Sequence, residues 1–337
     1  MRYKLLGKSG LRVSEVALGT MTFGEEWGWG ASKEESQRIF DTYVEAGGNF
    51  VDTANRYTTG TSERYLGEFI RPDRERFVLA TKYSLSMREG DPNAGGNHRK
   101  NMVQSVEASL KRLGTEYIDL FWLHMWDNMT PVEEVMRGLD DLVRAGKVLY
   151  VGISDTPAWI VSQANTMADL RGWSRFVALQ VPYSLAQREV ERDLLPMAKA
   201  FDMAVTPWGV LGAGVLTGKF QKGETGPTRV KPESIDARRQ AIAAEVTAVA
   251  EELGTTPARV AIAWARQQSN QIIPILGARS ATQLADNLGA LAVTLAPEHL
   301  ERLDQVSKIE LGFPHDFMAK NREWAFLHSK IDNHRRS

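Results

Sequence analysis

Three apolar runs in the first 125 residues each end on a side chain that can carry charge: Asp52, Lys82 and His124. If these runs are parallel strands, the three side chains emerge at the same carboxyl edge, where α/β proteins build their sites. A tyrosine, Tyr57, follows the first run by five residues. A carboxylate, an ammonium group, an imidazole and a phenol on one rim would form a site that donates protons.

The phenol of Tyr57 is the natural proton donor of this set. A free phenol has a pKa of about 10, so it donates slowly at neutral pH unless its phenolate is stabilised. Lys82 can supply that stabilisation, and Asp52 can keep the lysine charged. His124 can hydrogen-bond the same reacting oxygen. Together the groups suit protonation of a carbonyl oxygen during hydride attack, and because no side chain supplies a hydride, a nicotinamide cofactor is implied.

Each of these residues also has an ordinary structural interpretation. An aspartate after a strand commonly caps a turn, Tyr57 could pack at the surface, and His124 could be a core histidine among tryptophans. Their joint position at successive strand ends makes these interpretations less favoured. Spacing alone still leaves open a Schiff-base lysine at Lys82 or a metal site at Asp52 and His124.

The elements that would position these side chains follow from hydrophobic periodicity. Short apolar or β-branched runs alternate with stretches of helical period, such as the face formed by Val103, Val106, Leu110 and Leu113. The sequence predicts eight strands, at 16–18, 49–52, 77–81, 117–123, 148–153, 176–181, 203–206 and 271–276. Eight strand-helix repeats without a shift in composition predict one (β/α)₈ TIM barrel domain over residues 1–337.

Two segments lie outside this repeat. Residues 3–6 and 12–14 flank Ser9-Gly10 and predict an N-terminal β-hairpin that plugs one end of the barrel. The tail over residues 311–337 carries several aromatic side chains among charges, and we expect it to pack as an irregular C-terminal cover segment.

The composition excludes several classes of function. The formal net charge of the 337 residues is −1, so no global field would attract nucleic acid or an anionic membrane. The chain has no cysteine, which excludes disulfides, thiolate metal sites and cysteine nucleophiles. The first residues lack the apolar core of a signal peptide. We therefore expect a cytoplasmic protein that acts on a small molecule, with its oligomeric state open.

The chain resembles an aldo-keto reductase over residues 3–310. The resemblance lies in Phe50-Val51-Asp52-Thr53-Ala54 followed by Tyr57, in Thr61-Ser62-Glu63 and Leu66-Gly67, and in Thr81-Lys82 and Leu123-His124. It implies Tyr57 as the proton donor, Lys82 and Asp52 as the pair that tunes it, and His124 as the residue that orients the substrate.

The same resemblance implies a reaction. It is the reversible, NADPH-dependent reduction of aldehydes or ketones, with transfer from the A face of the nicotinamide and without a metal. Within the family, the chain is similar to the branch of channel β-subunits and bacterial general reductases. An NADP(H)-binding regulatory or sensor subunit with little turnover is therefore the alternative function.

The sequence lacks the usual glycine-rich phosphate motifs, so the cofactor phosphates must be held otherwise. In the segment 273–280 the last predicted strand turns directly into a helix, and helix N-terminal amides with an arginine, here Arg279, form a good anion site. A plain turn with Arg279 in solvent is the alternative. The resemblance favours NADP(H) over NAD(H) and implies contacts to the 2′-phosphate, adenine or ribose from Gly277, Arg279, Gln283, Asp286 and Asn287.

A second cofactor segment follows the seventh predicted strand. We expect Trp208 to stack on the nicotinamide, although core filling is the alternative, and the glycines after it to let backbone amides approach the pyrophosphate. The resemblance implies that Ser154, Asp155 and Gln180 hold the carboxamide, and Asp155 departs from the asparagine common there. The remaining expected cofactor residues are Thr20, Met21, Gly209, Leu211, Gly214 and Lys219.

The substrate side is predicted from aromatic residues in loops. Phe23 and Trp27 lie in the first loop and Trp126 lies two residues after His124, so we expect an apolar mouth that suits aldehydes or ketones with aromatic or aliphatic bodies. Tryptophans that pack against each other are the alternative. Residues 221–234 are predicted to be a mobile loop over the pyrophosphate, with Arg229 as a contact.

Overall fold

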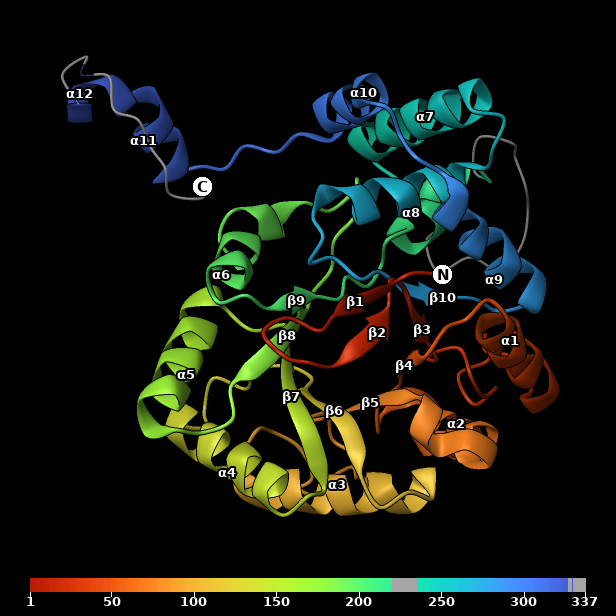
Figure 1. Ribbon diagram of the computed structural model, residues 1–337, viewed down its shortest axis with the longest axis vertical. Coiled ribbons are helices and arrows are strands. Elements are labelled where there is room, and N and C mark those ends of the chain that lie inside the picture. Colours follow the sequence, from red (N-terminus) through yellow and green to blue (C-terminus); the bar gives the residue numbers. More distant parts are fainter. Residues whose placement is uncertain (220–234, 327–328, 330–337) are drawn as a thin grey trace.

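The computed structural model describes residues 1–219, 235–326 and 329 (Figure 1). The predicted loop at 221–234, with Arg229, and the last residues of the tail lie outside the described residues.

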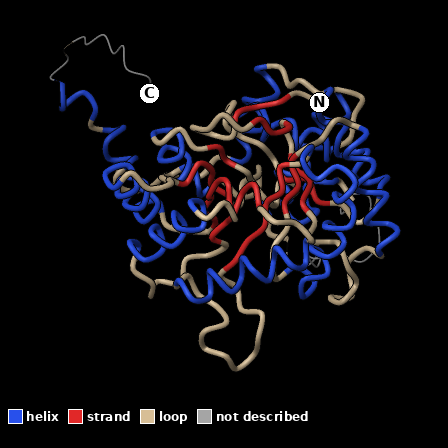
Figure 2. The backbone as a smooth tube through the Cα atoms, turned by 60° about the horizontal axis from the view of Figure 1, so that its bottom comes forward, coloured by secondary structure: helices blue, strands red, loops and turns tan. Residues whose placement is uncertain are grey.

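A parallel sheet of eight strands forms the centre of the protein, with helices around it (Figure 2). In sheet order the strands are β10 (Ile275–Gly277), β3 (Ala17–Gly19), β4 (Phe50–Asp52), β5 (Val78–Tyr83), β6 (Ile118–Leu123), β7 (Val148–Ser154), β8 (Phe176–Gln180) and β9 (Ala204–Val205). The amide of Val205 donates to Gln271 O at 2.9 Å, and the amide of Ile273 donates to Val205 O at 2.8 Å. These bonds join the two ends of the sheet, which confirms the predicted TIM-barrel fold.

The helices alternate with the strands and cover the outside of the barrel (Figure 1). The longer ones are α1 (Lys33–Glu45), α2 (Thr61–Ile70), α3 (Arg99–Leu113), α4 (Val132–Arg144), α5 (Ala158–Arg171), α6 (Leu194–Ala200), α7 (Ala237–Glu252), α8 (Pro257–Gln268), α9 (Ala281–Leu288) and α10 (Pro297–Ser307). On α3 the predicted apolar face is buried except for Val103, which is 41% exposed. None of the described helices is long and apolar enough to cross a membrane.

An antiparallel hairpin of β1 (Tyr3–Leu5) and β2 (Arg12–Ser14) precedes the barrel. Leu6 and Val13 are fully buried and belong to the same apolar cluster as Phe50 and Trp122, whose side chains fill the barrel interior. The hairpin therefore contributes to the core inside the barrel, as the sequence predicts.

The barrel interior is tightly packed below the carboxyl ends of its strands. Lys82, Trp122 and Gly152 form one row across β5, β6 and β7. A Cβ atom added to Gly152 would lie 2.3 Å from Cε3 of the fully buried Trp122 indole. Gly152 thus provides the room that this indole occupies.

We expect Gly152→Ala to lower the free energy of unfolding by roughly 1–3 kcal/mol, because overpacking forces the indole or the strand to move. Gly10→Ala is the matched control, since a Cβ at Gly10 meets nothing within 4 Å. Urea unfolding of both variants checks this. Equal stability of the two variants would contradict the packing described here.

The C-terminal segment differs from its prediction. It forms two short helices, α11 (His315–Lys320) and α12 (Arg322–Phe326), which lie apart from the barrel (Figure 1). Phe313 is 84% exposed and Trp324 is 77% exposed. The predicted cover is wrong for the described part of the tail, because charged residues between the aromatic ones form short helices rather than a buried layer.

Candidate active site

The centre of the candidate site is an ion pair between Lys82, in β5, and Asp52, at the end of β4. Lys82 is fully buried, and its Nζ donates to Asp52 Oδ2, to Thr53 O at 2.8 Å and to the Tyr57 hydroxyl at 3.2 Å. Burial alone lowers the pKa of Lys82, but the negative charge of Asp52 outweighs it and holds the pKa above its ordinary value. The ammonium group therefore stays charged.

Tyr57 begins a short 3₁₀ turn (Tyr57–Gly60) directly after this pair. Thr58 holds the turn, because its hydroxyl donates to Phe23 O at 2.6 Å. Burial raises the pKa of the Tyr57 phenol, and the nearby charge of Lys82 partly offsets that rise. The phenol is thus protonated at neutral pH, with a cation placed where its phenolate would need one.

His124 follows β6 and faces the tyrosine. The rings of Tyr57 and His124 meet edge to face, with centroids 6.0 Å apart. The buried Nδ1 of His124 has no hydrogen-bond partner among the described residues. Burial, followed by the charge of Lys82, lowers the pKa of His124 to about 3, so the imidazole is neutral at physiological pH and can hydrogen-bond a neutral oxygen.

The pKa of His124 makes the stability depend on pH. It lies near 6.5 in an unperturbed imidazole and at about 3 in the fold, so between these values the unfolded chain binds more protons than the folded protein. The stability that the fold gains with a neutral His124 is fully present above pH 6.5 and is lost as the pH falls toward 3. His124→Gln should therefore lose less stability than the wild type on acidification. Urea unfolding at pH 7.5 and pH 5 measures this, and identical losses would contradict it.

Two contacts that hold the site residues in place were not predicted from the sequence. Nε2 of Gln180 donates to Asp52 Oδ1 at 3.1 Å, so both carboxylate oxygens of Asp52 have partners. The fully buried Glu63 accepts from Thr81 at 2.6 Å and pairs with Arg112 at 2.5 Å, which fixes β5 just before Lys82. Glu63 lies in the Thr-Ser-Glu motif quoted above, but its partners are distant in sequence and no local pattern indicates them.

The same contacts bear on the alternatives left open by spacing. A Schiff-base lysine must lose its proton, whereas Lys82 is held charged by Asp52. A metal at Asp52 and His124 would have to displace Lys82 and Gln180 from the carboxylate. In the part of the chain that the structure describes, no group of three His, Cys, Asp or Glu side chains could hold a metal ion. The geometry therefore favours proton donation by Tyr57.

Next to the tetrad of Asp52, Tyr57, Lys82 and His124, the ends of β7, β8 and β9 form a rim that fits a nicotinamide. The Ser154 hydroxyl is buried without a hydrogen-bond partner in the described structure, which leaves it free to bind a polar ligand group. Gln180 is buried beside it in register, but its amide nitrogen already serves Asp52. The indole of Trp208 is 41% exposed at the rim, so one face is available for stacking.

The segment after β10 fits a phosphate and an adenosine. Arg279 is half-buried before α9, and its guanidinium has no hydrogen bond or ion pair with the described residues. Ser280 caps the helix by accepting from the amide of Gln283 at 3.2 Å. One further helix amide, that of Ala281, already donates to Glu35 Oε1 at 2.7 Å. The anion site therefore depends on Arg279 more than on the helix amides.

The other expected cofactor residues differ in accessibility. A Cβ atom added to Gly214 would lie 2.8 Å from Lys219 Nζ. One added to Gly209 or Gly277 would meet nothing within 4 Å, so both backbones are open to a ligand. Asp286 pairs with Arg259 at 2.9 Å, and Asn287 is buried. The rest are the half-buried Met21 and Leu211, the exposed Gln283 and the fully buried Thr20. Thr20 donates to Asp52 O at 3.0 Å, so its hydroxyl braces β4.

The predicted substrate residues are only partly brought to the site. Phe23 is fully buried and packs against Phe69 with ring centroids 6.1 Å apart, so its assignment as a substrate residue is wrong. The first loop folds back on itself, which turns Phe23 into the core. Trp126 is only 8% exposed in the same core, so at most its edge can reach a ligand. Trp27 is half-buried and its ring lies 5.6 Å from that of Trp29, so these tryptophans pack together.

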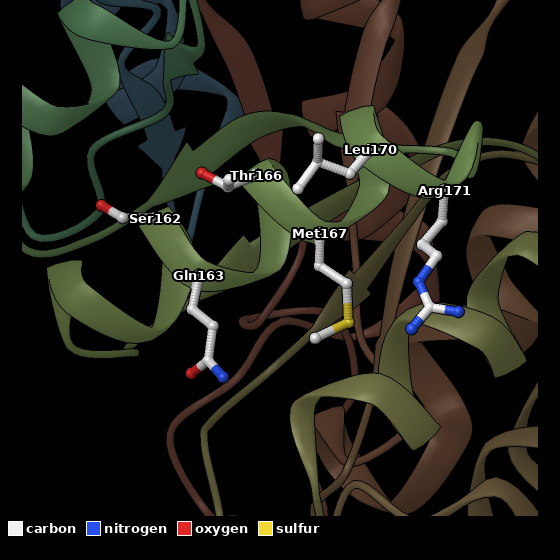
Figure 3. A pocket seen from close by; sticks show the side chains of 6 residues that line it. All are labelled: Ser162, Gln163, Thr166, Met167, Leu170 and Arg171. Carbon is white, nitrogen blue, oxygen red and sulfur yellow. The ribbon is translucent and has the colours of Figure 1, made fainter.

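A hollow on the outer face of α5 lies away from this site (Figure 3). Its lining comes from one helix and includes Met167, Leu170 and Arg171. Leu170 is 82% exposed, and Arg171 pairs with Glu133 at 3.5 Å. The hollow thus holds no cluster of groups that could carry out the chemistry described above.

Comparison with known proteins agrees with the geometry. The sequence model described as the aldo/keto reductase family matches residues 15–308. A norsolorinic acid reductase of Emericella nidulans is 38% identical over 97% of this chain and 86% of its own length. An aryl-alcohol dehydrogenase (NADP(+)) of Phanerodontia chrysosporium is 38% identical over 95% of this chain and 89% of its own length. A norsolorinic acid reductase of Aspergillus flavus is 39% identical over 93% of this chain and 83% of its own length.

Proposed function

The chain belongs to the aldo/keto reductase family, an oxidoreductase family, and we propose that it reduces aromatic aldehydes or ketones with NADPH, with Tyr57 as the proton donor. The observation that carries the proposal is the chain of contacts from Asp52 through the buried Lys82 ammonium to the Tyr57 hydroxyl. This arrangement stabilises negative charge on the phenol oxygen at the moment when the phenol gives up its proton.

The side chains divide the work of proton transfer. The carbonyl oxygen of the substrate accepts hydrogen bonds from the Tyr57 hydroxyl and the neutral His124 ring, which orient it. As negative charge builds on that oxygen, Tyr57 transfers its proton, and the charge of Lys82 stabilises the phenolate left behind. Asp52 keeps Lys82 charged, and Gln180 keeps Asp52 in place.

The rim residues would hold the cofactor. A bound nicotinamide supplies the hydride in this chemistry. Ser154 and Asp155 would bind its carboxamide and Trp208 would stack on the ring. Arg279 would bind the 2′-phosphate, which is why we propose NADPH rather than NADH. Lys219 would lie near the pyrophosphate, beside Gly214.

The substrate class rests on two supports. We expect Trp27, Met21 and the edge of Trp126 to line the mouth, where their apolar surfaces would suit a flat apolar body. By their names, the similar proteins above are reductases of norsolorinic acid and a dehydrogenase of aryl alcohols. We therefore propose an aromatic carbonyl compound as the substrate and an aryl alcohol as the product of reduction.

The test is the loss of NADPH absorbance with a panel of aromatic aldehydes, aliphatic aldehydes, ketones and sugars, run in parallel with NADH. We expect turnover with aromatic carbonyls and a clear preference for NADPH. Binding of NADPH without turnover on any member of the panel would instead indicate a cofactor-binding regulatory subunit.

Arg279→Ala should raise the KM for NADPH much more than the KM for NADH.

A further inference from the structure

The rim beside the tetrad carries one acidic side chain with an unusual backbone. Asp155 directly follows β7, and its φ is +39°, in the left-handed region that few residues other than glycine, asparagine and aspartate adopt. Its Oδ1 accepts the indole N–H of Trp208 at 3.4 Å. The hydrogen bond to the indole places this carboxylate at the rim, beside Trp208.

The other titratable groups at the centre balance their charges. Lys82 is paired with Asp52, His124 is neutral because burial lowers its pKa to about 3, and Tyr57 is protonated. Asp155 makes no ion pair with any described residue, and its only side-chain partner is the neutral indole. The charges of Lys82 and Asp52 cancel, and the other two groups are neutral. Asp155 therefore carries the net negative charge of the five groups.

Asp155 also lies within electrostatic reach of the proton donor. Desolvation of the carboxylate at the rim raises the pKa of Asp155, and the Trp208 hydrogen bond and the charge of Lys82 partly offset that rise. The charge of Asp155 in turn adds a small part to the rise in the pKa of Tyr57, which burial dominates. Hydride and proton are added to the two ends of one carbonyl bond, so a nicotinamide that reacts here must lie within a few ångström of the same carbonyl. The ring is therefore also within reach of the Asp155 charge.

The two redox states of the cofactor differ in charge at this ring. Reduction of a carbonyl consumes NADPH and a proton and yields an alcohol and NADP⁺; the nicotinamide is neutral before the step and positive after it. The phosphates and adenosine are the same in both. A negative charge near the ring therefore attracts the ring of bound NADP⁺ but not that of bound NADPH. It changes the difference between the binding free energies of the two dinucleotides.

We propose that Asp155 makes this site bind NADP⁺ more tightly, relative to NADPH, than a neutral residue at the same position would. The inference rests on the proposed function, because it requires a nicotinamide beside Tyr57. It gives Asp155 the role of setting the redox balance of the bound cofactor: by stabilising the positive ring, it makes bound NADPH a stronger hydride donor than it would be with an amide there.

The experiment measures the Kd of NADP⁺ and of NADPH by calorimetry at pH 8 for the wild type and Asp155→Asn. Asparagine tolerates the same backbone and keeps an acceptor for Trp208. Its new amide donor would meet the same carboxamide in both redox states, so the ratio of the two Kd values reports the loss of charge. Because Asp155 is exposed and partly screened, we expect the ratio of the two Kd values to shift toward NADPH by roughly three- to tenfold. Equal changes in both Kd values would overturn the proposal.

Two controls separate the charge from other effects. Glu25→Gln removes one negative charge from the exposed first loop and should leave the ratio unchanged; the same shift there would overturn a local role of Asp155. Asp155→Asn in a Trp208→Phe background should still shift the ratio, and loss of the shift would show that Asp155 acts only through the indole. A wild type that binds neither dinucleotide would refute the proposed function itself, whereas normal binding with an unchanged ratio refutes only this inference.

Discussion

Replacing Tyr57 with phenylalanine should lower kcat for carbonyl reduction by roughly 10²- to 10⁴-fold, because the substrate oxygen loses its proton donor. The ring stays in place and only the hydroxyl that lies 3.2 Å from Lys82 Nζ is removed. Affinity for NADPH and the free energy of unfolding should therefore change little. Steady-state kinetics with an aromatic aldehyde, together with calorimetric binding of NADPH, measure both quantities.

The matched control for this variant is Tyr65→Phe. Tyr65 lies on α2 outside the tetrad, so loss of its hydroxyl should leave kcat near the wild-type value. A Tyr57→Phe variant that keeps its rate within about tenfold of the wild type would remove Tyr57 from the role of proton donor.

Replacing Lys82 with methionine should abolish turnover and also destabilise the fold by roughly 3–5 kcal/mol. The variant leaves Asp52, which is 1% exposed, without its cation in a buried setting. Only the amide of Gln180 would still serve the carboxylate. Urea unfolding gives the stability, and the NADPH assay gives the activity.

The double variant Asp52→Asn with Lys82→Met separates stability from catalysis. With no charge left to bury, it should recover much of the lost stability, because a pair replaced by neutral groups costs far less than a pair that is broken. Its activity should remain absent, since no cation stabilises the Tyr57 phenolate. A double variant less stable than Lys82→Met alone would contradict the ion pair as the reason for the loss.

The fold and the tetrad could be predicted from the sequence because the relevant signals are local. Apolar runs that end on Asp52, Lys82 and His124 give both the strands and the edge at which the three side chains meet. The barrel then follows from the strand-helix repeat, and the hairpin from its two short runs around a turn.

The supporting contacts and the mouth could not be predicted in this way. The bonds of Gln180 to Asp52 and of Glu63 to Arg112 join residues that are 128 and 49 positions apart, and no periodicity records them. Phe23 was expected at the mouth because it is aromatic and lies in a loop, but that loop folds inward. The aromatic residues of the tail were expected to be buried for their apolar character alone, whereas their helices make no layer on the barrel.

Transfer of deuterium from NADPH labelled on the A face of its nicotinamide is the most direct test of the central claim that this site reduces carbonyls by hydride transfer. After reaction with an aromatic aldehyde, mass spectrometry should find one deuterium on the alcohol carbon with the wild type, and roughly 10²- to 10⁴-fold less labelled alcohol with Tyr57→Phe over the same time. An alcohol product that carries no label with the wild type would contradict this account.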